Sequence, residues 1–294
     1  MRKKISREAL AAWSFLLPNL LGFLCISLIP IIASIAISFT DWKILKTPSF
    51  NGINNYIDLF THDEKFGQIL MNTVVYIVGT VPVGVILAIL VACLLNQKIR
   101  GRAFFRVCVF VPVVCSTVSA AMLWKWLYAK DIGLIAYYVR LFFGVSAPDF
   151  LLDTNWAMIA VIIFSIWKGL GYNVVLFLAG LQGIDSSYYE AARVDGANPF
   201  QSFFKITVPL LTPTTFFVFI MSIINSFQVF DQTYVLTKGG PANATTTIVY
   251  YIYEKGFVEY QMGYASAMAW ILFLIVMLVT IIQWKLQARW VNYD

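Results

Sequence analysis

Ionisable and polar side chains inside long apolar stretches are the residues of this chain best suited to handle a polar molecule. Lys168 stands near the middle of the apolar stretch 156–182. An ionisable group at such a position normally faces protein or water and is a functional candidate, although it can instead snorkel or bond a backbone carbonyl. If Lys168 faces an aqueous path, Asp231 is a conceivable partner for it.

Two helical faces, one in the apolar stretch 156–182 and one in the stretch 206–230, carry groups that suit a hydroxyl-rich solute. Trp167, Gly171 and Val174 follow the spacing i, i+4, i+7, which places them on one face of a helix. An aromatic ring, a glycine that permits close approach and several polar groups form a lining that could contact a sugar. The alternative is that the polar groups bond between helices and the glycine serves packing. In the stretch 206–230, Ser222, Asn225, Ser226 and Val229 share a second face, with Gln228 beside it. The candidate pathway residues are Trp167, Lys168, Gly171, Tyr172, Asn173, Ser222, Asn225, Ser226 and Gln228.

Catalytic motifs are missing from the sequence. There is no G-x-x-x-x-G-K-[ST] phosphate loop, no H-E-x-x-H and no nucleophile elbow. The spacing of Cys25, Cys93, Cys108 and Cys115 indicates neither a metal site nor a disulfide framework, and His62 lies alone in a loop. We therefore expect no enzyme, no catalytic residue, no metal and no cofactor on this chain.

The composition places the chain in a membrane. Hydrophobic residues make up 60%, charged residues 12%, and the mean hydropathy is +0.77, whereas a soluble domain is about half apolar and about a quarter charged. A bilayer crossing needs about 20 predominantly apolar residues. Six stretches meet this rule, at about 10–39, 69–95, 104–127, 156–182, 206–230 and 264–284. The sequence thus predicts one all-α, polytopic membrane domain over 1–294.

The first stretch follows a basic N-terminus, as in a signal peptide. Its apolar run is about twice as long as the 7–15 residues of a signal-peptide core, so we expect a retained anchor. Pro18 and Pro30 predict kinks or a tilt within it.

The distribution of Lys and Arg predicts that both termini are cytoplasmic. With the N-terminus inside, twelve basic residues lie on the cytoplasmic side and eight outside, as the positive-inside rule requires. The net charge of +6 fits this bias and gives no reason to expect a nucleic-acid partner.

The connector SSYYEAARVDGANPF (186–200) is unusually structured for a cytoplasmic loop. Ser187 and Glu190 have the spacing of a capping box, and Gly196 suits the left-handed position that ends a helix. Asn198 and Pro199 then predict the start of a second helix. The local sequence is compatible with a helix resting on lipid headgroups or with a docking surface for another protein.

The spacing within this loop resembles the EAA signature of binding-protein-dependent ABC importer permeases. Glu190, Ala191 and Ala192 are followed after three residues by Gly196, and after nine more by Ile206-Thr207-Val208-Pro209. Val208 departs from the leucine more usual in the family. The segments FNGINNYIDLF (50–60), IWKGLGYNVVLFLAGLQGI (166–184) and FDQTYVLTKGGPANATTTIVYYIYEKGF (230–257) are similar to the carbohydrate-uptake branch, the maltose and glycerol-phosphate type.

The resemblance implies a type I permease fold and a role in ATP-driven import of a sugar or oligosaccharide. It implies that Glu190, Ala191, Ala192 and Gly196 form the coupling helix that docks on the ATPase, and that the pathway residues lie in the stretches carrying the sugar site. The implied partners are a second homologous permease, two cytoplasmic ATPase subunits that use ATP and Mg, and an extracytoplasmic solute-binding protein. The implied location is the inner or plasma membrane of a prokaryote.

Three alternatives stay open. Within the same class, glycerol 3-phosphate or a polyol would fit as the solute, and Lys168 could favour a phosphate. An ion-coupled secondary carrier commonly shows internal repeats and intramembrane carboxylates, and neither is evident here. A membrane enzyme lacks any catalytic constellation to support it.

Overall fold

The structure is a computed structural model that describes residues 7–44, 46–97 and 100–291. Within these ranges the chain is predominantly helical, and β structure is limited to the isolated bridges Thr40–Phe50 and Lys43–Gln261. The all-α prediction is therefore confirmed. The described residues form two compact units, 7–63 with 252–271, and 64–251 with 272–291. Four basic residues used for the orientation, Arg2, Lys3, Lys4 and Lys98, lie outside the described residues.

The first unit begins with an apolar helix of three consecutive segments. These are α1 (Arg7–Gly22), a π-helical segment η1 (Phe23–Leu28) and α2 (Ile29–Ser38). Pro18 lies inside α1 without ending it. The π segment immediately precedes α2, where Pro30 supplies no N–H to the helical ladder. The kinks or tilt expected from Pro18 and Pro30 thus correspond to a local π-helical segment just before Pro30.

The loop that follows is anchored on the end of α2. Its helix α3 (Asn54–Thr61) buries Asn55, whose Nδ2 donates to the carbonyls of Ser38 and Thr40 at 2.8 and 2.9 Å. The Tyr56 hydroxyl donates to Ser38 Oγ at 2.7 Å. A π segment η3 (Glu254–Val258) and the beginning of α15 (Met262–Gln287) complete this unit.

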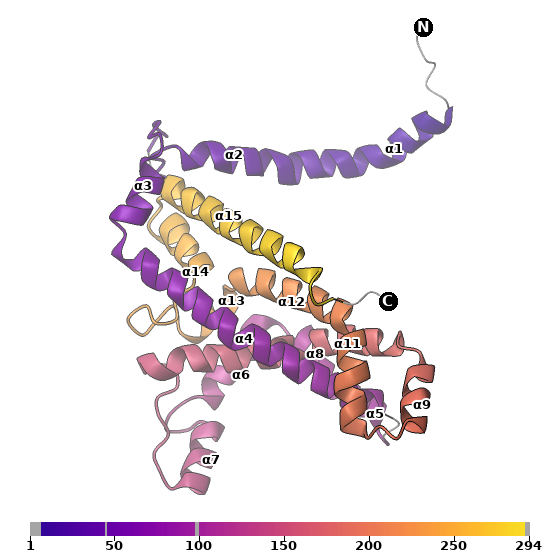
Figure 1. The fold of residues 1–294 in the computed structure, drawn as a ribbon. Coiled ribbons are helices and arrows are strands. Elements are labelled where there is room, and N and C mark those ends of the chain that lie inside the picture. Colours follow the sequence, from indigo (N-terminus) through magenta and orange to yellow (C-terminus); the bar gives the residue numbers. More distant parts are fainter. Residues whose placement is uncertain (1–6, 45, 98–99, 292–294) are drawn as a thin grey trace. The chain divides into compact units, whose positions relative to one another are not determined.

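The second unit is built on two long helices, α4 (Glu64–Asn96) and α8 (Thr154–Gln182), which pack extensively on each other. Helix α12 (Thr212–Phe227) packs on α4, and α5 (Arg102–Val114) packs on α8. Helix α13 (Asp231–Leu236) contacts α6 (Thr117–Leu127). The shorter helices α7 (Leu134–Phe143) and α14 (Ile248–Tyr253) lie in the connections (Figure 1).

The stretch predicted as one crossing at 104–127 is two helices. Helices α5 and α6 meet at an angle of 102°, and Cys115 between them is extended, with ψ 145°. Pro112 lies inside α5 and supplies no N–H to the helical ladder, and the helix ends two residues later at Val114. The predicted kinks concerned only Pro18 and Pro30 of the first stretch, so this break was not predicted.

The fifth stretch is also bent. Helix α10 (Pro199–Ser202), the π segment η2 (Phe203–Thr207) and α11 (Val208–Leu210) lead into α12 after a bend of 65°. The straight apolar helix therefore begins at Thr212 and not near 206.

In the part of the chain that the structure describes, four helices have the length and apolar character of a membrane crossing: Ala11–Ser38, Glu64–Asn96, Thr154–Gln182 and Met262–Gln287. The number rises to six if each bent pair is counted as one crossing. The six-crossing topology and the cytoplasmic termini stay predictions.

Candidate functional site: a polar cavity and a capped helical loop

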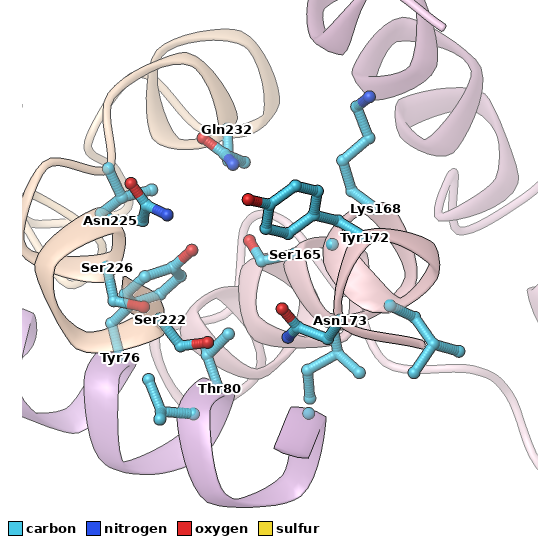
Figure 2. A pocket seen from close by; sticks show the side chains of 16 residues that line it. Tyr76, Thr80, Ser165, Lys168, Tyr172, Asn173, Ser222, Asn225, Ser226 and Gln232 are labelled. Atoms are coloured by element: carbon cyan, nitrogen blue, oxygen red, sulfur yellow. The ribbon is translucent and has the colours of Figure 1, made fainter. Parts of the chain in front are cut away.

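A cavity of about 190 Å³ lies within the second unit, between α4, α8, α12 and α13. Figure 2 shows phenol, hydroxyl and amide groups converging on it from these helices. The polar side chains in its lining are Tyr76, Thr80, Ser165, Lys168, Tyr172, Asn173, Ser222, Asn225, Ser226 and Gln232. This lining can offer many neutral hydrogen-bonding groups and two aromatic rings to a solute.

Six of the nine predicted pathway residues line this cavity. Lys168, Tyr172 and Asn173 come from α8, and Ser222, Asn225 and Ser226 come from α12. The structure thus brings together residues separated by about fifty positions in the sequence. Their role in a solute pathway stays a prediction.

Trp167, Gly171 and Gln228 are not part of the cavity lining. Trp167 lies in an aromatic cluster, with its ring 5.2 Å from Trp124 and 6.1 Å from Phe164. A Cβ on Gly171 would contact the carbonyl oxygen of Val109 on α5, so this glycine permits close packing of α8 on α5. The face that carries Trp167 and Gly171 therefore packs on α6 and α5.

The ammonium group of Lys168 bonds three backbone carbonyls at the break between α5 and α6. Its Nζ lies 2.6 Å from Pro112 O, 2.8 Å from Cys115 O and 3.2 Å from Val113 O. Among the described residues no ion pair joins Lys168 to Asp231. The alternative of a carbonyl-bonded lysine is thus observed, on a residue that also borders the cavity.

Four polar lining residues were missed by the sequence analysis: Tyr76, Thr80, Ser165 and Gln232. Tyr76 and Thr80 lie on α4 at the spacing i, i+4, so a polar face within an otherwise apolar helix was an available signal. Nothing in the sequence indicated that this face lies opposite α12.

The 186–200 loop forms the predicted pair of short helices, but the first is capped differently. Helix α9 (Ser186–Val194) has Asp185 as its N-cap, and the carboxylate accepts a hydrogen bond from the Ser187 N–H at 2.9 Å. The predicted capping box between Ser187 and Glu190 is therefore wrong, because the helix has its N-cap at Asp185 and begins two residues earlier than predicted. The bond from the Ser187 N–H lowers the pKa of the Asp185 carboxyl.

The end of α9 agrees with the prediction. Gly196 has φ +77°, the left-handed conformation that glycine adopts at little cost. The Ala197 N–H donates to Ala192 O at 2.8 Å and the Gly196 N–H to Arg193 O at 3.1 Å, which is a Schellman motif. Asn198 and Gln201 then form a capping box at the start of α10, with Pro199 in the first turn.

One side of this loop is fixed to the protein and the other is exposed. Ala192 is buried, and the hydroxyl groups of Tyr189 and Thr207 are 3.0 Å apart. Glu190 and Ala191 are exposed. Large apolar side chains are also exposed here and were missed by the sequence analysis: Tyr188 at 51%, Val194 at 89%, Phe200 at 72% and Phe204 at 53%.

Comparison with known proteins assigns the chain to a family. Residues 65–292 match the model described as the binding-protein-dependent transport system inner membrane component. The chain belongs to this family. It is a multi-pass membrane protein with relatives in bacteria.

The curated relatives extend over nearly the whole chain. It is 38% identical to a probable ABC transporter permease protein, YesP of Bacillus subtilis, over 99% of this chain and 95% of that one. It is 36% identical to the multiple sugar-binding transport system permease protein MsmF of Streptococcus mutans, over 94% and 95%. It is also 36% identical to the sn-glycerol-3-phosphate transport system permease protein UgpA of Agrobacterium fabrum, over 83% of each chain.

The fold has a counterpart among solved structures. A chain of a bacterial alginate ABC transporter, in complex with its alginate pentasaccharide-bound periplasmic protein, superposes with a TM-score of 0.85 over 96% of both chains at 23% identity. The expected ABC importer permease fold is therefore confirmed.

Proposed function

We propose that this permease forms part of the path by which a neutral saccharide or oligosaccharide is imported, driven by ATPase subunits that dock on α9 and α10. The observation that carries the proposal is the cavity between α4, α8, α12 and α13, lined by neutral hydrogen-bonding groups and two tyrosine rings. Sugars need such a combination, because hydroxyls require hydrogen bonds and C–H faces require flat apolar surfaces.

The size of the cavity favours a shared site. About 190 Å³ is less than the roughly 300–1,000 Å³ of sites that enclose a drug-sized ligand. The remaining wall would come from a second, homologous permease. The loaded extracytoplasmic solute-binding protein would deliver the sugar from outside a prokaryotic inner or plasma membrane.

The state of Lys168 favours a neutral solute over glycerol 3-phosphate. Lys168 is the one ionisable cation in the described lining, and an ammonium group has three N–H donors. All three are directed at carbonyl oxygens, so none is free for a phosphate. One relative is named as a glycerol-3-phosphate permease. Glycerol 3-phosphate, together with a polyol, is therefore the alternative solute to test.

The exposed surface of the loop supports a docking role. Val194, Phe200 and Phe204 expose apolar side chains in a loop that is anchored from its other side. ATP binding would bring the ATPase subunits together and move α9, switching the path between inward-facing and outward-facing states. The loaded binding protein would favour the outward-facing state by binding it more tightly, as coupling requires.

Uptake by the reconstituted transporter with its solute-binding protein tests the pathway. Asn225→Ala and Asn173→Ala each remove an amide from the cavity, and we expect apparent solute affinity to fall about tenfold, since a lost hydrogen bond contributes about 0.5–1.5 kcal/mol and the stranded partner adds to the cost. Gln228→Ala removes an amide outside the cavity and should leave uptake within about twofold. Equal effects at Asn225 and Gln228 would contradict the assignment.

The same preparation separates the classes of transporter. Uptake should require ATP and persist when an ionophore collapses the ion gradients. Uptake that follows the gradient and ignores ATP would indicate an ion-coupled carrier. Radiolabelled glycerol 3-phosphate and neutral oligosaccharides, offered in parallel, distinguish the two solute classes.

A further inference from the structure

The break between α5 and α6 exposes backbone carbonyls that have no helical donor. The last turn of any α-helix leaves its carbonyl groups without intrahelical partners, and α5 ends at Val114 inside an apolar stretch. Irregular backbone at membrane depth occurs only where it is buried in protein or lines a water-filled cavity. A donor from a neighbouring helix stabilises the backbone at this point.

Lys168 supplies that donor. Its Nζ lies within hydrogen-bond distance of the carbonyls of Pro112, Val113 and Cys115. Carbonyl oxygens only accept, so three such bonds require the protonated ammonium with its three N–H groups. The positive charge also lies at the C-terminal end of α5, where the helix dipole favours a cation.

The packing of α8 on α5 allows this contact. Gly171 lies one turn after Lys168, and a Cβ there would meet Val113 Cγ2 at 2.9 Å and Phe110 Cα at 3.1 Å. The close approach brings the Lys168 side chain to the broken turn. In Figure 2 this side chain extends away from the polar groups of Ser165 and Asn173.

We propose that Lys168 is a positioning residue of the transport path, which ties the break of the third apolar stretch to α8 so that α5, α6 and α8 move as one body during the transport cycle. Lys168 acts here through the backbone of α5 and α6 and not by binding the solute. The cavity wall formed by α8 then keeps its shape while the transporter switches between its inward-facing and outward-facing states.

The inference rests on the proposed function for its account of the cycle, but its test does not depend on which solute is imported. Val107 on α5 and Met122 on α6 are 60% and 64% exposed, so spin labels can be attached there in a background with the four native cysteines replaced by serine. Double electron–electron resonance on the complete transporter then gives the distance across the break.

In the wild type we expect one narrow distance distribution, unchanged between the nucleotide-free complex and the complex trapped with ATP and vanadate. Lys168→Met keeps an unbranched chain and removes every donor, so the distribution should broaden at least twofold or split. Lys168→Arg retains a cation with several donors and should remain close to wild type. Lys125→Met, an exposed lysine on α6, is the matched control and should change nothing.

Two results would overturn the proposal. One is a wild-type distance that shifts by several ångströms between the two trapped states, since the break would then be a moving hinge. The other is a Lys168→Met distribution identical to wild type. If Lys168→Met fails to assemble, two measurements still test the proposal. One is the wild-type distance in the two trapped states, and the other is the distance distribution of Lys168→Gln, which removes the charge but keeps an amide donor. Failure of ATP and vanadate to trap the complex would instead count against the proposed function, and the nucleotide-free variants would still test the tie.

Discussion

Replacing Gly196 by alanine isolates the backbone geometry that ends α9. Gly196 has φ +77°, and a Cβ added there would meet nothing within 4 Å. The substitution therefore introduces no clash with a neighbouring group, and its cost is the strain of an L-residue in the left-handed region, about 1–2 kcal/mol. A cost of this size corresponds to a factor of about 5–30 in an equilibrium.

The strain can be relieved only by giving up the Schellman motif. Leaving the left-handed conformation breaks the bonds from the Ala197 N–H to Ala192 O and from the Gly196 N–H to Arg193 O. The last turn of α9 then frays, and the exposed Glu190, Ala191 and Val194 lose their fixed arrangement. If the ATPase subunits dock on the intact helix, their apparent affinity should fall by the same factor of about 5–30.

The assay measures binding of ATPase subunits to the permease in nanodiscs, together with solute transported per ATP hydrolysed. Gly196→Asn should be milder than Gly196→Ala, because asparagine tolerates the left-handed region better. Gly183→Ala is the matched control in the same connection, since its φ is −80° and its nearest contact for a Cβ is an ordinary 3.4 Å. Wild-type affinity and coupling in Gly196→Ala, or equal loss in Gly183→Ala, would refute the reasoning.

Three further substitutions test separate parts of the structure. Gly171→Ala should reduce the fraction of assembled, thermally stable permease, by roughly 1–3 kcal/mol of overpacking, because its Cβ would contact the backbone of α5. Asp185→Ala should fray the start of α9, and in the wild type the Asp185 carboxyl should titrate below its ordinary pKa of 3.8, as read from the Ser187 amide resonance. Thr246→Val should lower stability by about 1–3 kcal/mol, because the buried Thr246 hydroxyl donates to Gly239 O at 3.0 Å.

The cap that Asp185 places on α9 depends on pH. Because the pKa of Asp185 is depressed in the folded protein, the cap stabilises α9 at pH values above the unfolded pKa. That contribution is lost as the pH falls through the lower, folded pKa. Transport between pH 5 and 8 should therefore not depend on this group, and a titration midpoint at or above 3.8 would contradict the cap. Gly22→Ala is the control for Gly171→Ala, because a Cβ at Gly22 would meet nothing within 4 Å. Equal stability of these two variants would show that the packing of α8 on α5 does not require a glycine. A Thr246→Val protein as stable as wild type would show that the Thr246 hydrogen bond contributes little.

Local sequence was sufficient wherever the physics is local. Gly196 in the left-handed conformation, the capping box of Asn198 with Gln201 and the helical nature of the apolar stretches were predictable, since each depends on residues within one or two turns. The EAA spacing led to the correct family for the same reason, because it is a contiguous pattern. The cap at Asp185 was not predicted, although aspartate is a common N-cap residue and stands two residues before Ser187.

The arrangement of the cavity depended on the tertiary structure. Helical periodicity shows which residues share a face, but it does not show what that face packs against. Trp167 and Gly171 were grouped with the pathway for this reason, and the structure places them against α6 and α5. Tyr76 and Gln232 entered the lining only once α4, α8, α12 and α13 were assembled.

By itself the sequence determined an all-helical membrane protein of the permease family with a capped helical connector at 186–200, because apolar length, capping residues and contiguous motifs are properties of the chain. Only the tertiary structure decided that the third apolar stretch breaks after Pro112 and that Lys168 satisfies the carbonyls of the break. The bond partners lie more than fifty positions from Lys168 along the chain. No local preference encodes such a contact, since it exists only when α8 packs closely on α5.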